Sequence, residues 1–103
     1  MVFLSIVVPC YNEEESVGMF FDEIEKTLPD RDFEIIYVND GSRDNTLANI
    51  KKLSKEKTKG TYISFSRNFG KESAIYAGLE SSMGDYICVM DVDLQHDDKE
   101  KSP

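Results

Sequence analysis

The segment Leu4-Ser5-Ile6-Val7-Val8 is an almost unbroken run of apolar residues, and the largely polar segment Pro9-Cys10-Tyr11-Asn12-Glu13 follows it directly. A strand that helices cover on both faces has such a run, because neither of its faces meets water. A second run, Ile35-Ile36-Tyr37-Val38, has the same character and is also followed by polar residues. The two runs predict buried strands of a parallel sheet.

Strand and helix patterns alternate along the chain. Strands rich in Ile, Val, Tyr and Phe are expected at Phe3–Pro9, Phe33–Asn39, Thr61–Ser66 and Asp85–Asp91. The first, second and fourth of these are expected to be buried. Helices are expected over Glu13–Leu28, from near Asp44, and from about Gly70 to Ser82. This order predicts the α/β class, as a three-layer αβα sandwich with a mostly parallel sheet and right-handed crossovers.

The first helix carries the clearest signals. Its apolar residues recur at spacings of three and four, at Val17, Phe20, Phe21, Ile24 and Leu28. Asn12 is expected to cap its N-terminus, and Glu15 to complete a capping box. In the second helix, the side chains expected to point toward the core are Leu47, Ile50 and Leu53. In the third helix, Ile75 and Leu79 lie one turn apart.

Length, charge and cysteine content limit the class of protein. The 103 residues suffice for one domain, expected at residues 1–96, and the polar stretch 97–103 is expected to fray. A formal net charge of −8 argues against nucleic acid as a partner, because clustered Lys and Arg hold phosphate backbones. Cys10 and Cys88 lie in apolar runs, which favours reduced core thiols and a cytoplasmic setting.

Candidate ligand residues follow the predicted strands, where open parallel sheets bind their ligands. Asp91 and Asp93 are two apart, so an extended chain directs both carboxylates to one side. They form either a solvated turn or a site for Mg²⁺ or Mn²⁺, which would also bind substrate phosphates. Spacing alone favours the turn.

Four further residues carry the same ambiguity. Asp40 either forms a turn with Gly41 or supplies a carboxylate that accepts hydrogen bonds from a base or ribose. Glu13 is either a partner of the helix dipole or a pocket carboxylate. Arg67 and Lys71 flank a glycine before a helix, which suits either a diphosphate or surface salt bridges.

Several motifs occur in one collinear series: Val7-Val8-Pro9-Cys10-Tyr11-Asn12-Glu13-Glu14, Val38-Asn39-Asp40-Gly41-Ser42, Ser66-Arg67-Asn68-Phe69-Gly70-Lys71 and Met90-Asp91-Val92-Asp93-Leu94-Gln95. This series resembles the inverting family of nucleotide-sugar glycosyltransferases with the GT-A fold, especially members that act on polyprenyl phosphates. The chain has neither a Gly-x-Gly-x-x-Gly fingerprint nor a phosphate loop, which removes the commonest dinucleotide and ATP interpretations.

The resemblance implies roles for the candidate residues. The base and ribose would be surrounded by Pro9, Tyr11, Glu13 and Asp40. Asp91 would lie near the diphosphate and Asp93 would ligate Mg²⁺ or Mn²⁺, with the pocket wall completed by Arg67 and Lys71. The implied reaction transfers a hexose from a nucleotide-diphospho-sugar, with a UDP-sugar favoured, to a polyprenyl phosphate or glycan acceptor.

The resemblance also implies that this chain carries the donor site only. Members of the family have a later catalytic carboxylate and an acceptor segment, so no catalytic residue is assigned here. The chain is expected to bind nucleotide weakly and to transfer no sugar, and the full-length protein is expected at the cytoplasmic face of the membrane. The alternatives are a receiver-like magnesium-binding signalling module and a homo-oligomer assembled through exposed sheet edges.

Overall fold

The computed structural model describes residues 3–93, and the predicted tail 97–103 lies outside this range. The elements alternate as expected: β1 (Phe3–Cys10), α1 (Val17–Thr27), β2 (Asp32–Asn39), α2 (Thr46–Glu56), β3 (Gly60–Ser64), α3 (Lys71–Ser81) and β4 (Tyr86–Val89). The third and fourth strands are shorter than predicted. Ser66 and Asp91 therefore lie in the loops that follow them.

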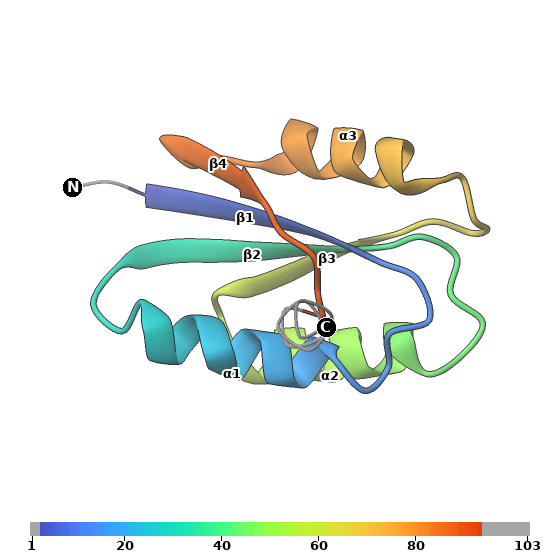
Figure 1. The fold of residues 1–103 in the computed structure, drawn as a ribbon, viewed down its shortest axis with the longest axis horizontal. Helices are drawn as coiled ribbons and strands as arrows, with labels where there is room; N and C mark the ends of the chain where they lie inside the picture. The colour runs from blue at the N-terminus through green and yellow to red at the C-terminus, as the bar shows by residue number, and fades with distance from the viewer. Residues whose placement is uncertain (1–2, 94–103) are drawn as a thin grey trace, which may run out of the picture.

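The four strands form one parallel sheet in the order β3-β2-β1-β4. Helices α1 and α2 cover one face and α3 lies on the other (Figure 1). This arrangement confirms the three-layer sandwich. The carboxyl ends of β1 and β2 lie level, because Cys10 pairs with Asn39 in the register.

Two apolar clusters fill the space between the layers. Beneath α1 and α2, the core gathers Ile6, Val8, Phe20, Phe21, Ile35 and Tyr37, among others. Beneath α3, a smaller cluster contains Val7, Ile36, Val38 and Ala74. Alternate residues of β1 and β2 thus enter opposite clusters, which confirms that both strands are buried on both faces.

The predicted start of the first helix is wrong. Helix α1 begins at Val17, its N-cap is Ser16, and that serine makes no side-chain capping bond. Asn12 has a φ of 55° and its side-chain oxygen accepts the N–H of Arg43 at 2.9 Å. Because the Asn12 side chain bonds to the loop after β2, it does not cap the helix, and the capping box with Glu15 does not form.

Strand β4 is more exposed than its apolar sequence predicts. Tyr86 is 65% exposed and Val89 is 42% exposed. Within residues 3–93, β4 pairs with β1 alone and forms one edge of the sheet, whereas α3 packs above β1 and β2. The prediction that this strand is buried is therefore wrong for the described part of the chain.

Helix α3 approaches the sheet through its smallest residues. Its buried positions are Ala74 and Gly78, whereas Ile75 is half-buried and Leu79 is exposed. A Cβ built on Gly78 would lie 2.3 Å from Cγ1 of Val7, which is fully buried in β1. Gly78 therefore permits the close contact between α3 and the sheet.

Two helical glycines provide a matched test of this contact. Gly78→Ala is expected to lower the free energy of unfolding by about 1 kcal/mol, since overpacking outweighs the gain in helix propensity. Gly18→Ala in α1 meets nothing within 4 Å and is expected to raise it by up to about 1 kcal/mol. Urea unfolding measures both. In a Val7→Ala background, Gly78→Ala should become stabilising; destabilisation that persists there would contradict the proposed clash.

Candidate functional site

A cleft opens at the carboxyl edge of the sheet. Its wall is formed by Pro9, Cys10, Tyr11, Glu13, Asp40, Lys71, Asp91, Val92 and Asp93. These residues end or follow β1, follow β2 and β4, or begin α3, so four separate parts of the chain meet there. The structure brings together all the site residues predicted from the sequence except Arg67.

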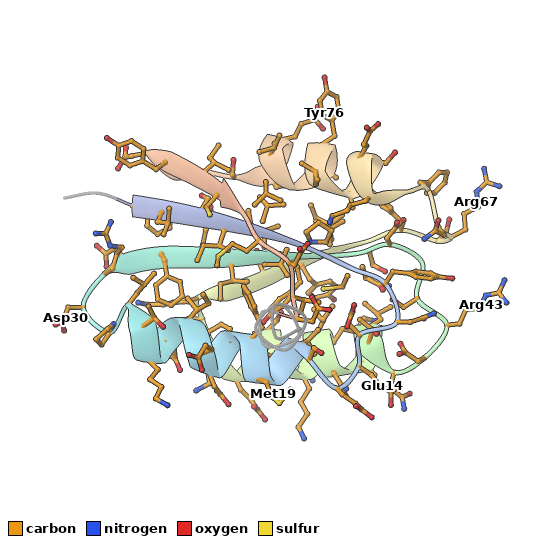
Figure 2. The ribbon with its side chains drawn as sticks, in the orientation of Figure 1. Glu14, Met19, Asp30, Arg43, Arg67 and Tyr76 are labelled. Atoms are coloured by element: carbon orange, nitrogen blue, oxygen red, sulfur yellow. The ribbon has the colours of Figure 1, made fainter. Side chains whose placement is uncertain are left out.

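Arg67 lies outside this cleft. Its guanidinium is 4.7 Å from the centre of the Phe69 ring, which is a cation–π contact. Figure 2 shows its side chain pointing outward at the far end of the loop before α3. In this structure Arg67 supports the outer surface of the loop and adds no positive charge to the cleft wall.

The segment after β4 brings both aspartates to the wall of the cleft. Val92 between them is 5% exposed and packs into the core beneath α1 and α2. Asp91 and Asp93 therefore flank a residue that is anchored in the core, and both line the cleft.

A positive charge from α3 meets these carboxylates. The Nζ of Lys71 donates to Oδ1 of Asp91 at 2.9 Å, and both side chains are more than half exposed. Lys71 is the first residue of α3, where the helix dipole also favours anions. The cleft thus has a carboxylate pair on one wall and a movable ammonium group beside it.

The carboxylate pair fits a hard divalent cation only when other ligands complete the coordination shell. Within residues 3–93, no group of three or more His, Cys, Asp or Glu side chains is placed to hold a metal ion. Mg²⁺ in proteins is commonly bound by one or two carboxylates together with substrate phosphates and water. Asp91 and Asp93 can supply the protein's share of such a shell.

The loop after β1 is fastened to the loop and helix after β2. The N–H of Glu13 donates to Oγ1 of Thr46 at 2.8 Å, and the N–H of Asn45 donates to Oε1 of Glu14 at 2.9 Å. Nδ2 of Asn49 donates to the carbonyl of Glu14 at 2.8 Å. These bonds fix the backbone that carries Tyr11 and Glu13 at the rim of the cleft.

Three residues of the site were not predicted from the sequence. Val92 and Cys10 line the cleft. Val92 is an apolar residue between two aspartates, and Cys10 follows an apolar run, so hydropathy assigned Cys10 to the core, where it is indeed a buried free thiol. Burial, with a contribution from Glu13, raises the pKa of Cys10, so it is a neutral wall and not a nucleophile. Thr46 is fully buried at the start of α2, where its hydroxyl accepts the N–H of Glu13.

The chain matches the family model described as Glycosyl transferase family 2 over residues 5–103. It is 47% identical over 95 residues to "Putative glycosyltransferase CsbB" of Bacillus subtilis, covering 90% of this chain and 29% of that protein. It is 43% identical over 94 residues to "Prophage bactoprenol glucosyl transferase homolog" of Escherichia coli, covering 89% and 31%. "Dodecaprenyl-phosphate galacturonate synthase" of Rhizobium johnstonii is 41% identical over 101 residues, covering 94% and 30%. The chain therefore spans about 30% of the length of these relatives.

Solved structures share the fold. The mannosyltransferase PcManGT from Pyrobaculum calidifontis, in complex with GDP-Man and Mn²⁺, has a TM-score of 0.78 at 22% identity, covering 87% of this chain and 27% of that one. Glucosyl-3-phosphoglycerate synthase from Mycobacterium tuberculosis, in complex with UDP, has a TM-score of 0.70 at 25% identity, covering 90% and 34%. These matches show that the described sheet is the N-terminal portion of a GT-A transferase fold. None of the helices within residues 3–93 is long and apolar enough to cross a membrane.

Thr46, which binds Glu13 of the loop after β1, also donates to the carboxylate of Asp44, and this second contact predicts that the stability depends on pH. Burial opposes the shift, but hydrogen bonds from the hydroxyl and the N–H of Thr46 lower the pKa of Asp44 below its ordinary value of 3.8. A carboxyl with a lowered folded pKa stabilises the fold above its unfolded pKa, and this contribution is lost as the pH falls. Asp44→Ala is expected to lower the free energy of unfolding by about 1 kcal/mol at neutral pH, because it removes the acceptor of two hydrogen bonds from Thr46.

The difference between Asp44→Ala and the unmodified chain should shrink as the pH falls below about 4. Urea unfolding across this pH range measures it. Asp30→Ala, an exposed aspartate in the loop after α1, is the matched control and should change the stability little. An equal loss for Asp44→Ala at neutral and acid pH would show that the carboxylate charge is not the stabilising feature.

Proposed function

The chain belongs to glycosyl transferase family 2, and we propose that it carries the donor half of a transferase that moves a hexose from a nucleotide-diphospho-sugar to a polyprenyl phosphate. The observation that carries this proposal is the cleft itself, where Asp91 and Asp93 face the same space as Lys71. A bound diphosphate needs cations to neutralise its negative charge, and so do two neighbouring carboxylates. A metal-bound nucleotide diphosphate would satisfy both requirements.

The nucleoside end of the donor would lie against the loop after β1. Tyr11 is 44% exposed, so one surface of its ring is accessible to a base. Pro9 and Glu13 line the same wall, and Glu13 supplies a carboxylate that can accept hydrogen bonds from ribose hydroxyls or base N–H groups. The bonds of Glu13 and Glu14 to α2 keep this wall rigid, which lowers the entropy cost of binding.

The diphosphate end would lie between α3 and the segment after β4. Asp91 and Asp93 would hold Mg²⁺ or Mn²⁺, which supplies charge neutralisation for the departing nucleotide diphosphate. Lys71 can exchange its bond to Asp91 for one to a phosphate oxygen, since its ammonium group is half exposed and its side chain is flexible. The −8 net charge of the chain makes these local cations necessary for an anionic donor.

The described cleft is part of a donor site. Its volume of about 170 Å³ is below the roughly 300 Å³ at which pockets for whole small molecules begin. We propose that the sugar and the acceptor are bound by protein beyond this chain, in keeping with the longer relatives, and that residues 3–93 alone transfer no sugar. We favour a UDP-sugar as donor because the structurally similar glucosyl-3-phosphoglycerate synthase is in complex with UDP, whereas the similar mannosyltransferase is in complex with GDP-Man. The acceptor class follows the relatives named for bactoprenol and dodecaprenyl phosphate, which would place the full-length protein at a membrane face.

Calorimetric titration with UDP tests the donor proposal directly. Mn²⁺ is expected to raise the affinity of the chain for UDP by about tenfold or more, because the ion bridges phosphate and carboxylate oxygens. Asp93→Ala should abolish this gain without changing the weaker binding that is expected in the absence of metal. GDP in place of UDP reports the base preference.

The control for this titration is Asp30→Ala, which removes an aspartate in the loop after α1, at the end of the molecule away from the cleft (Figure 2). It should leave the metal-dependent gain unchanged. UDP binding that needs no metal and is unaffected by Asp93→Ala would remove the basis of the proposed site.

Substitution of Lys71 is expected to change two affinities, for Mn²⁺ alone and for UDP without metal, in opposite directions. Lys71→Met removes a cation that competes for Asp91, so the affinity for Mn²⁺ alone should rise by about twofold to fivefold. The same change removes a phosphate contact, so the affinity for UDP without metal should fall. Electron paramagnetic resonance of free Mn²⁺ and calorimetry measure the two effects. Lys26→Met, on the exposed surface of α1, should alter neither; a parallel change of both affinities in Lys71→Met would contradict the proposed exchange.

A further inference from the structure

Asp40 is the most enclosed carboxylate of the cleft. It is 4% exposed and follows β2 directly, at the centre of the carboxyl edge. Its Oδ1 accepts the N–H of Phe69 at 2.8 Å, and its Oδ2 accepts the N–H of Gly70 at 3.1 Å and Nδ2 of Asn68 at 3.1 Å. A carboxylate has about four acceptor positions, so the chain itself takes up most of those of Asp40.

The backbone around Asp40 is shaped for the same contact. Its carbonyl oxygen also accepts Nδ2 of Asn68, at 3.1 Å. Gly41 has a φ of 69°, and a Cβ there would lie 2.2 Å from the backbone carbon of Arg67. Only a glycine allows the two loops to lie so close, and its left-handed backbone lets the chain turn away after Asp40. The loop after β2 and the loop before α3 are thus packed backbone against backbone.

The turn that Asp40 holds leads directly into α3. Gly70 has a φ of 105° and serves as the N-cap, and its carbonyl accepts the N–H of Ala74 at 3.2 Å. Lys71, the next residue, reaches Asp91 across the cleft. The position of the ammonium group therefore depends on the position of Gly70, whose N–H is bound by Asp40.

We propose that Asp40 is a positioning residue of the donor site, which holds the turn Asn68-Phe69-Gly70 so that Lys71 reaches the phosphate side of the cleft. This inference rests on the proposed donor function. It differs from the expectation that Asp40 binds the base or ribose. Under that expectation, loss of the carboxylate would weaken binding of a nucleoside; under positioning, it weakens binding of phosphates.

Two probes separate these roles: uridine, which has no phosphate, and inorganic pyrophosphate with Mg²⁺, which has no base. In NMR titrations of the 103-residue chain, Asp40→Asn is expected to weaken pyrophosphate binding by about fivefold to tenfold and uridine binding by less than about twofold. Asn68→Ala removes two hydrogen bonds to Asp40 from an exposed side chain outside the cleft wall. It should give a smaller loss, of about twofold to threefold, for pyrophosphate alone.

A double-mutant cycle with Lys71 identifies the route of the effect. In a Lys71→Met background, Asp40→Asn should cost no further pyrophosphate affinity, because the group that Asp40 positions is already gone. A loss that is purely structural would persist in that background and would appear with uridine as well. Circular dichroism and urea unfolding verify that each variant folds, and Asn68→Ala carries the test if Asp40→Asn does not fold.

The outcomes are distinct for the two proposals. If the unmodified chain binds neither pyrophosphate nor UDP with Mg²⁺, the donor function fails, and the role of Asp40 fails with it. If it binds them but Asp40→Asn weakens uridine most, or weakens pyrophosphate equally with and without Lys71, only the positioning role is overturned. A loss confined to pyrophosphate and absent in the Lys71→Met background supports it.

Discussion

The backbone N–H of Asp40 donates to the carbonyl of Cys10 at 2.8 Å, one residue beyond the register pair of Cys10 with Asn39. This bond continues the β1–β2 ladder to the edge of the sheet, where both chains turn toward their helices. Because the two strands end level, the loops that follow them begin side by side. The bonds from Glu13 to Thr46 and from Arg43 to Asn12 then join loops that are already adjacent. The cleft takes its geometry from a backbone ladder, which is the most rigid support the fold offers.

The charges of the site are arranged on this frame. Asp91 and Asp93 are like charges two residues apart, and solvent exposure with the ammonium of Lys71 reduces their mutual repulsion. Val92 anchors the segment that carries both aspartates, because it is buried beneath α1 and α2. A substitution that loosens this core should therefore also disturb the site.

The sequence predicts the centre of this fold far better than its edges. The runs in β1 and β2 are continuous and apolar, as is typical of strands buried on both faces. Strand β4 has the run Tyr86-Ile87-Cys88-Val89, yet it lies at an edge of the described sheet. Composition cannot distinguish an edge strand from a central one, because strand order depends on contacts distant in sequence. Asn12 failed as a cap for a related reason: its competing partner, Arg43, is 31 residues away.

The same division separates what topology predicts of the candidate site from what it leaves open. Parallel strands carry every residue that follows them to one edge, so topology alone brings together Glu13, Asp40 and Asp91. Topology does not determine which partner each side chain then chooses. Arg67 chooses the Phe69 ring, two residues away, and Asp40 takes the N–H groups of the turn before α3. The partners of Asp40 lie 28 to 30 residues away in the sequence, and the close approach at Gly41 brings the two loops together. An acidic residue after a strand is therefore evidence for a ligand site at that edge, while its own contact can still be with the loop that completes the site.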